Sequence, residues 1–186
     1  MKKIAFLFIA LMSVALTSAQ TEVGGVNLPN SETYQGKTLN LNGAGVREKL
    51  WIDLYAGGLY LSNKSSDAAA IIAAKEPMSI KLHIVSKLIT SDKMVDAVNE
   101  GFEKSTSGNT KLLATEIDKF KSFFMAEIKK NDVFDIVYIP ETGVTVYKNE
   151  KELGTIEGLD FKKALFGIWL SNKPADDDLK EAMLGK

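Results

Sequence analysis

Residues 46–61 read Val46-Arg47-Glu48-Lys49-Leu50-Trp51-Ile52-Asp53-Leu54-Tyr55-Ala56-Gly57-Gly58-Leu59-Tyr60-Leu61, and apolar side chains alternate with polar ones through its first half. An alternation with a period of two is typical of a strand that buries one face. It predicts a long strand with Arg47, Trp51 and Tyr55 on the same face. Glycines before and within the run favour a bulge or bend, so this shared face depends on an unbroken strand.

Working outward from this run, strands and helices are expected in blocks and not in strict alternation. Helical spacing and capping residues predict the helices, and short apolar runs bounded by turn residues predict the strands. The expected strands are 23–28, 38–41, 46–61, 78–85, 133–139, 144–147 and 153–156, and the expected helices are 68–74, 91–108, 113–128, 161–168 and a last short one ending near 184. Such blocks predict an α+β fold, with a large antiparallel sheet covered by helices on one face.

The N-terminal segment predicts export. Met1-Lys2-Lys3 is followed by apolar residues 4–16 and then by Thr17-Ser18-Ala19. A basic start, a short apolar centre and small residues before a cut are the pattern of a secretory signal. We therefore expect residues 1–19 to be removed, and residues 20–186 to form one domain in the periplasm or outside the cell. No later apolar run is long enough for a membrane span.

The charge and cysteine content of the chain limit the kinds of molecule that it is expected to bind. The chain has 23 basic and 24 acidic side chains and no cysteine. A mildly acidic surface without a basic patch argues against nucleic acid as a partner. The absence of cysteine means that the exported fold must depend on its packed core and not on disulfides. We expect a monomer.

Cofactor and metal motifs are absent from the sequence. Gly43-Ala44-Gly45 begins like a dinucleotide-binding loop, but Glu48 occupies the third glycine position and a strand follows. His83 is the single histidine and has no neighbouring nucleophile pattern, so a structural role is favoured over a catalytic one. Residues 176–178 are three aspartates, which are interpreted as the start of a helix and not as a calcium loop. No cofactor and no metal are expected.

Arg47 is the only arginine among the 23 basic residues. Its guanidinium is planar and always charged, and it can hold a carboxylate with two parallel hydrogen bonds. Because every other basic side chain is a lysine, the solitary arginine is interpreted as a functional residue. The alternative from composition alone is an incidental surface residue.

Three motifs give the chain a resemblance to a known family. They are Leu41-Asn42-Gly43-Ala44-Gly45-Val46-Arg47, Leu54-Tyr55-Ala56-Gly57-Gly58-Leu59-Tyr60-Leu61 and Ala164-Leu165-Phe166-Gly167-Ile168-Trp169-Leu170, the last followed by Pro174 and Leu179. In this order and spacing the chain resembles the chalcone isomerase-like family in its exported bacterial form, from about Val23 to Gly185. The resemblance implies an open-faced β-sandwich, in which a ligand cleft lies between a large antiparallel sheet and a layer of helices.

The resemblance implies two activities. Plant members close a chalcone into a flavanone, whereas a related branch binds fatty acids and holds the carboxylate with the arginine of the motif and a tyrosine. Fold alone does not choose between them. The family's arginine and asparagine fall on Arg47 and Asn99. Its two threonines fall on Tyr55 and Ile168, and its catalytic tyrosine falls on Asp92.

These positions indicate a binding protein more than an isomerase. A carboxylate at Asp92 would repel the charge that develops on the enone oxygen during ring closure. The expected function is a non-catalytic binder of a fatty acid or similar amphiphilic anion, with Arg47, Tyr55, Asn99 and Trp51 as candidate contacts. Trp51 and Tyr55 also suit a core, and Asn99 suits a helix surface. An isomerase with a rearranged site, or an envelope interaction protein with a vestigial cleft, are the alternative hypotheses.

Overall fold

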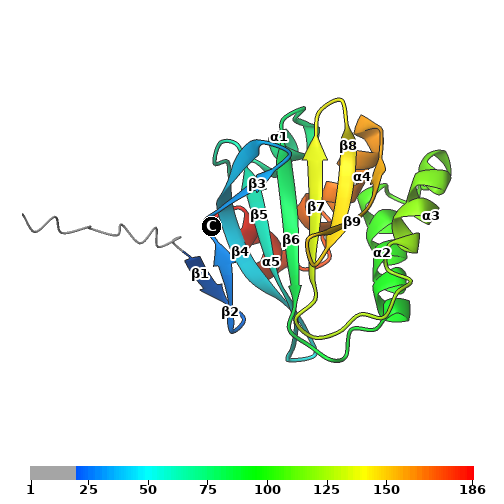
Figure 1. Ribbon diagram of the computed structural model, residues 1–186. Coiled ribbons are helices and arrows are strands. Elements are labelled where there is room, and N and C mark those ends of the chain that lie inside the picture. Colours follow the sequence, from blue (N-terminus) through cyan, green and yellow to red (C-terminus); the bar gives the residue numbers. More distant parts are fainter. Residues whose placement is uncertain (1–19) are drawn as a thin grey trace, which may run out of the picture.

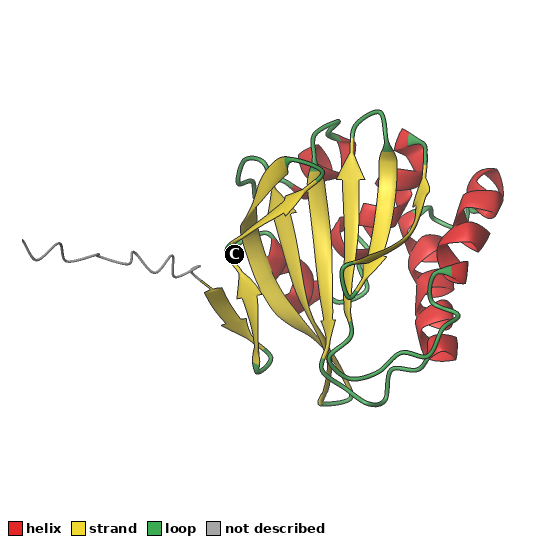
Figure 2. Ribbon diagram, viewed as in Figure 1, coloured by secondary structure: helices red, strands yellow, loops and turns green. Residues whose placement is uncertain are grey.

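The computed structural model describes residues 20–186, which form a curled sheet with helices on one side (Figure 1). The predicted signal segment, residues 1–19, lies outside the described residues. The expected α+β class is confirmed, and so is the layer of helices over one face of a large antiparallel sheet (Figure 2).

Within residues 20–186, seven strands form the main sheet, and each pairs with the next strand along the chain. Every pairing is antiparallel. The strands are β3 (Ser31–Tyr34), β4 (Lys37–Lys49), β5 (Ile52–Leu61), β6 (Met78–Ile84), β7 (Val133–Ile139), β8 (Gly143–Lys148) and β9 (Lys151–Ile156). A separate hairpin of β1 (Gln20–Val23) and β2 (Val26–Pro29) precedes them.

The helices pack against the sheet face that carries Ile80, Leu82 and Ile84 of β6. Period-two alternation places these three side chains on the core side, as the sequence predicts. The helices are α1 (Ala68–Ala73), α2 (Ser91–Ser105), α3 (Ala114–Ser122), which a 3₁₀ turn (Lys111–Leu113) precedes, α4 (Leu159–Leu170) and α5 (Asp177–Met183). The core therefore lies between one sheet face and the helical layer.

The run 46–61 is not one strand, and this is the main correction to the predicted elements. The chain reverses at Leu50-Trp51, and Lys49 of β4 pairs with Ile52 of β5 across a two-residue turn. Arg47 and Tyr55 still share a face, because they are cross-strand partners and not because an unbroken strand joins them. On the turn side of this pair, Glu48 pairs with Asp53. Leu54 therefore has no partner on β4 and forms a bulge.

Helix ends differ from the predictions by several residues. The predicted helix 91–108 ends at Ser105; Thr90 is its N-cap, and the Ser91 hydroxyl donates to the Phe124 carbonyl at 2.5 Å. The predicted helix 113–128 ends at Ser122, although Phe124 and Ile128, which continue the helical spacing of Ile117 and Phe120, are buried in the segment that follows. The apolar spacing therefore identified these core residues correctly but misplaced the end of the helix. Residues can be buried side by side without all belonging to one helix.

The short helix α5 packs directly on β4 and β5 where these strands carry glycine. A Cβ atom on Gly45 would lie 2.6 Å from the Ala182 Cβ, and one on Gly43 would overlap the Ala182 carbonyl oxygen. The glycines of the first family motif are therefore required by the close approach of a helix backbone. Asp176 caps α5 by accepting from the Leu179 amide at 2.8 Å, which confirms the predicted role of the aspartate run.

The opposite face of the sheet holds a buried ionic network. Lys81 of β6 lies 2.7 Å from Asp135 and 2.9 Å from Glu32, and the Tyr34 hydroxyl donates to Asp135 at 2.8 Å. Tyr34 belongs to β3 and Asp135 to β7, although three strands separate these two in the sheet. The contact shows how strongly the sheet curls, because β3 folds back over the outer face of the sheet and reaches β7.

Candidate functional site

Arg47 and Tyr55 lie side by side at the end of the β4–β5 ladder. The Arg47 Cζ atom lies 5.8 Å from the centre of the Tyr55 ring, within the range of a cation–π contact. Arg47 is half-buried and Tyr55 is buried. The local fold thus places the only arginine of the chain on an aromatic ring, with its guanidinium partly removed from water.

Trp169 of α4 completes this group from the helical layer. Its indole Nε1 donates a hydrogen bond to the Tyr55 hydroxyl oxygen at 2.9 Å, and both side chains are buried. Because the hydroxyl oxygen accepts from Trp169, the phenol proton remains available to an acceptor on a ligand. Trp169 is not among the predicted ligand contacts, although it stands in the last of the three family motifs.

Burial keeps Tyr55 in its protonated form. Burial raises the pKa of Tyr55 and outweighs the Arg47 charge and the Trp169 hydrogen bond, which act in the opposite direction. The pair therefore presents a permanent cation and a neutral hydroxyl donor. Both groups suit an oxyanion, and neither provides a base.

Arg47 has no ion-pair partner among residues 20–186, where no carboxylate lies within 4.0 Å of it. Glu100 is close enough for the charges of Lys49 and Arg47 to contribute to its lowered pKa, but its main partner is Lys104 at 2.6 Å. A half-buried guanidinium without a direct counter-ion favours the binding of an external anion.

A pocket of about 410 Å³ lies beside the pair, in the size range of small-molecule sites. The β4–β5 hairpin, the loop after β6 and the first half of α2 enclose it. Its walls are mainly apolar, with charged side chains around them. The lining residues are Arg47, Lys49, Leu50, Ile52, Leu54, Tyr55, Leu88, Ile89, Lys93, Met94, Asp96, Ala97 and Glu100.

Two of the four predicted ligand contacts lie outside this pocket. Trp51 sits at the tip of the β4–β5 turn and points into solvent. Asn99 is exposed on α2 and lines a separate hollow of about 230 Å³ with Asp118 and Lys121. The structure therefore brings together Arg47 and Tyr55, but neither Asn99 nor Trp51 joins them.

The positions that the resemblance matches to the family's catalytic tyrosine and late threonine hold no equivalent group. Asp92 is exposed in the first turn of α2 and does not line the Arg47 pocket. Ile168 is buried against α2, where a Cβ atom on Gly101 would lie 2.8 Å from its Cγ2 atom. The pocket thus contains a polar pair at one end and no further hydroxyl from α4.

His83, the single histidine, does not line the Arg47 pocket. His83 shares the outer face of β6 with Lys81, and burial together with the Lys81 charge lowers its pKa. Residues 20–186 contain no group of three or more histidine, aspartate or glutamate side chains arranged to hold a metal ion. Over the same residues, every helix is too short or too polar to cross a membrane.

Comparisons with known proteins agree on the family and the fold. A fatty-acid binding protein from Arabidopsis thaliana has a similar structure, with a TM-score of 0.68 and 19% sequence identity over 86% of this chain and 92% of that one. A search of curated protein sequences gave no match. The sequence profile described as chalcone isomerase-like matches residues 20–185. With a match over nearly all of its described residues, the chain belongs to the chalcone isomerase-like family.

Proposed function

We propose that this protein binds a fatty acid or a similar amphiphilic anion in the pocket between the β4–β5 hairpin and α2. The observation that carries this proposal is the half-buried Arg47, which has no carboxylate partner among residues 20–186 and lies on the Tyr55 ring. A ligand carboxylate would accept two hydrogen bonds from the guanidinium and one from the phenol. The fatty-acid binding protein of similar fold supports the same ligand class.

The rest of the pocket suits an aliphatic chain. Leu54, Ile89 and Met94 line it between the hairpin and α2, and Met94 and Ile89 are part of the buried core. Methionine adapts its shape to irregular apolar ligands. An acyl chain placed there would lose contact with water while its head group stayed at the polar end.

The pocket supports binding better than isomerase chemistry, because the two positions that match the family's catalytic tyrosine and late threonine supply no donor there. Ring closure of a chalcone needs donors next to the developing enolate. Asp92 lies outside the pocket, and Ile168 supplies no hydroxyl. We therefore propose a binding protein in preference to an isomerase.

We also propose that the protein works outside the cytoplasm, after removal of residues 1–19. This proposal is supported by the basic start, the short apolar centre and the small residues before position 20. Mass spectrometry of the protein from the culture fluid or periplasmic fraction tests this directly. A mature chain that begins at Gln20 is expected, and an uncut cytoplasmic chain would contradict export.

The binding test starts with the purified wild-type protein. Organic extraction followed by mass spectrometry should recover a co-purified fatty acid, and titration of the stripped protein with a fluorescent fatty acid should show saturable binding. Arg47→Ala should weaken this binding about ten- to a hundredfold, because it removes a charge-assisted contact of roughly 1.5–3 kcal/mol. Lys37→Ala, an exposed cation on β4 outside the pocket, is the matched control.

Arg47→Lys separates a two-bond grip from simple charge attraction. Lysine keeps the charge but has no planar fork, so binding should fall between the wild type and Arg47→Ala. A wild-type protein that carries no lipid and also ignores added fatty acid would refute the proposed function.

A further inference from the structure

The mouth of the Arg47 pocket is surrounded by exposed apolar side chains, which we call the apolar tip. It consists of Leu50, Trp51 and Ile52 at the β4–β5 turn and Leu88 in the loop after β6. Their exposed fractions are 75%, 90%, 40% and 48%. Leu50, Ile52 and Leu88 line the same pocket, so the tip is one continuous surface at its entrance. Such a cluster on a soluble domain marks a contact surface.

The backbone of the turn is strained in order to hold these side chains outward. Leu50 and Trp51 have φ angles of 53° and 60°, in the left-handed region that glycine and asparagine favour. Two-residue hairpin turns with positive φ usually carry Asn-Gly. Two bulky residues in this conformation cost stability, and a site where such strain persists is a candidate for function.

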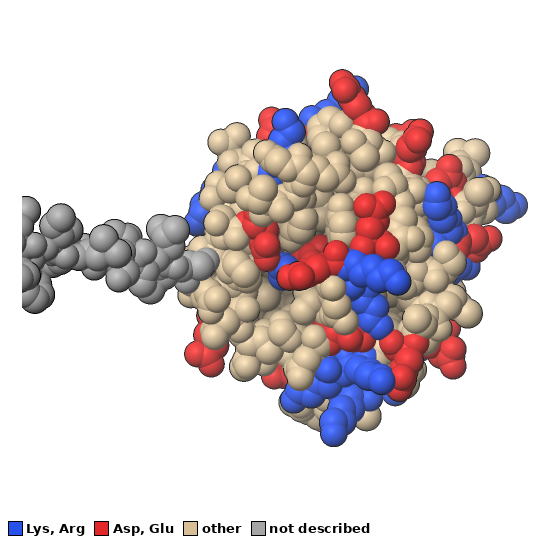
Figure 3. Space-filling model, in the orientation of Figure 1, with Lys and Arg blue, Asp and Glu red and all other residues tan. Residues whose placement is uncertain are grey.

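Lysines surround the tip and make it suited to a lipid surface. Lys49 precedes the turn and Lys87 precedes Leu88, and both side chains are exposed. Figure 3 shows lysine and arginine gathered at the lower end of the molecule, where Figure 1 places the connections after β4, β6 and α3. Glu48 and Asp53 also lie near the turn, so the charge supplements the apolar contact and does not replace it.

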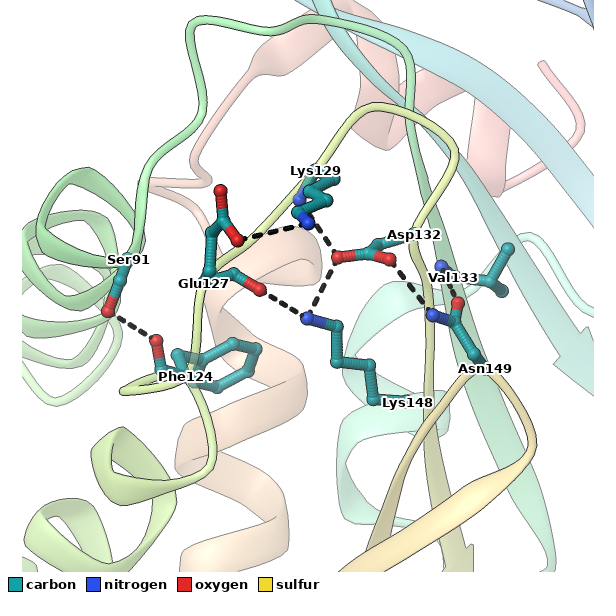
Figure 4. A network of polar contacts seen from close by, with 8 residues as sticks. All are labelled: Ser91, Phe124, Glu127, Lys129, Asp132, Val133, Lys148 and Asn149. Atoms are coloured by element: carbon teal, nitrogen blue, oxygen red, sulfur yellow. Dashed lines mark hydrogen bonds and ion pairs between the residues drawn. The ribbon is translucent and has the colours of Figure 1, made fainter.

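The connections at this end are held firmly in place. The amides of Val85 and Ser86 donate to the Leu54 carbonyl, which attaches the loop after β6 to β5. Next to it, the segment before β7 is fixed by Lys148, which lies 2.8 Å from Asp132 and donates to the Glu127 carbonyl at 2.6 Å (Figure 4). The first of these contacts holds the start of the loop that carries Leu88 next to the strand that follows the turn.

We propose that the apolar tip docks on the surface of a phospholipid bilayer, with Trp51 and Leu50 in the interfacial layer and Lys49 and Lys87 at the head groups. Tryptophan prefers this interface, where its ring is buried and its N–H remains hydrated, and lysine extends toward anionic head groups. Anionic lipid complements the two lysines, which a neutral apolar protein surface would not. Docked in this way, the pocket entrance faces the membrane.

Co-sedimentation with vesicles tests the docking. Wild-type protein should bind vesicles of phosphatidylcholine and phosphatidylglycerol, bind pure phosphatidylcholine more weakly, and shift its Trp51 fluorescence to shorter wavelength on binding. Trp51→Gly suits the positive φ of the turn and should lower the partition coefficient roughly tenfold or more. Leu112→Ser is the matched control, because Leu112 is 82% exposed but precedes α3, at the other end of α2.

The variants distinguish a failure of membrane docking from a failure of ligand binding. Without vesicles, Trp51→Gly should bind a fluorescent fatty acid like the wild type, because Trp51 does not line the pocket. Arg47→Ala should bind the fatty acid about ten- to a hundredfold more weakly but bind vesicles like the wild type. Docking is overturned if wild type ignores both kinds of vesicle or if Trp51→Gly binds them equally well. It is also overturned if sedimentation shows that the tip instead joins two copies of the chain.

Discussion

The Tyr55 hydroxyl links the proposed ligand site to the core. It accepts the Trp169 indole hydrogen bond at 2.9 Å, and its ring lies beside the Arg47 guanidinium. A buried indole N–H without a partner costs more than the hydrogen bond itself contributes. Removing the hydroxyl therefore affects stability as well as binding.

We expect Tyr55→Phe to lower the free energy of unfolding by about 1–3 kcal/mol, because it leaves the Trp169 Nε1 unpaired in the core. Urea denaturation followed by circular dichroism measures the change. Tyr147→Phe is the control, since the Tyr147 hydroxyl makes only an exposed contact with Gln35 at 3.3 Å. Equal losses in the two variants would show that the indole contact adds nothing to stability.

The sequence predicted Arg47 and Tyr55 as ligand contacts, and the structure shows why Trp169, the hydrogen-bond partner of Tyr55, could not be predicted from sequence patterns. Arg47 stands out in composition, and its family motif marks the strand that carries it. Trp169 lies 114 positions from Tyr55 along the chain. A tryptophan within an apolar helix is usually a core residue, so only the packing of α4 on β5 reveals its hydrogen bond.

At the scale of the element, the β4–β5 hairpin shows that an alternating sequence pattern predicts extended structure but not where the chain reverses. Alternation in residues 46–61 correctly indicated extended structure, but it contains no Asn-Gly or Asp-Gly signal for a reversal. The turn forms because the two strands pair along most of their lengths and leave only Leu50-Trp51 to connect them. Tertiary pairing thus overrides the local preference of both residues.

Replacing both turn residues by Asn-Gly, as in L50N/W51G, should raise the free energy of unfolding by about 1–2 kcal/mol, because it removes the left-handed strain. Thermal and urea denaturation measure it. Ile52→Thr, just outside the turn, keeps the strained backbone and should bring no such gain. A double variant less stable than wild type would mean that the apolar tip packs on the protein more than its exposure indicates.

Helix α1 depends on a buried lysine of α4. The Lys162 ammonium donates to the carbonyls of Ile71, Ile72 and Ala74, each at 2.9 Å, and so satisfies the C-terminal end of the helix. Burial, and to a lesser extent the charge of Lys163, lower the pKa of Lys162 to about 8. The group therefore titrates earlier in the folded protein than in the unfolded chain.

This difference predicts a stability that depends on pH. Between pH 8 and about 10.5, the unfolded chain holds a proton on Lys162 that the folded protein has lost. The free energy of unfolding should therefore rise with pH in this window, by at most about 1.4 kcal/mol per unit. Urea titrations of wild type and Lys162→Met at several pH values isolate the effect, since other groups titrate equally in both. A constant difference between the two proteins would contradict it.

At the scale of the whole molecule, α5 closes the sheet over the glycines of β4 and β5. The Asn42 side chain adds hydrogen bonds to the Met183 carbonyl at 2.8 Å and to the Ser65 carbonyl at 2.9 Å. The C-terminal helix is thereby joined to the first long strand and to the segment before α1. The glycines and the asparagine of the first family motif have this structural role, while its arginine faces the pocket.

Gly43→Ala should unfold the protein or lower its free energy of unfolding by more than about 3 kcal/mol, because the new methyl group overlaps the backbone of α5. Gly57→Ala is the matched control. Its Cβ would meet the flexible end of Met183 at 2.8 Å, and a loss of about 1 kcal/mol is expected. Calorimetry of both variants measures the difference, and similar transition temperatures would contradict the close packing of α5.

The open sheet has two outer strands, and both are poor templates for pairing with another chain. β3 has four residues and turns back across the sheet, where Tyr34 is fixed to Asp135. β9 begins with Lys151 and Glu152, pairs through a shifted register, and contains Gly154 at a φ of 153°. Short, charged or irregular edges resist strand addition between molecules. A chain that has no cysteine, and so no disulfide to stabilise it, is thereby protected from edge-to-edge association of its sheets.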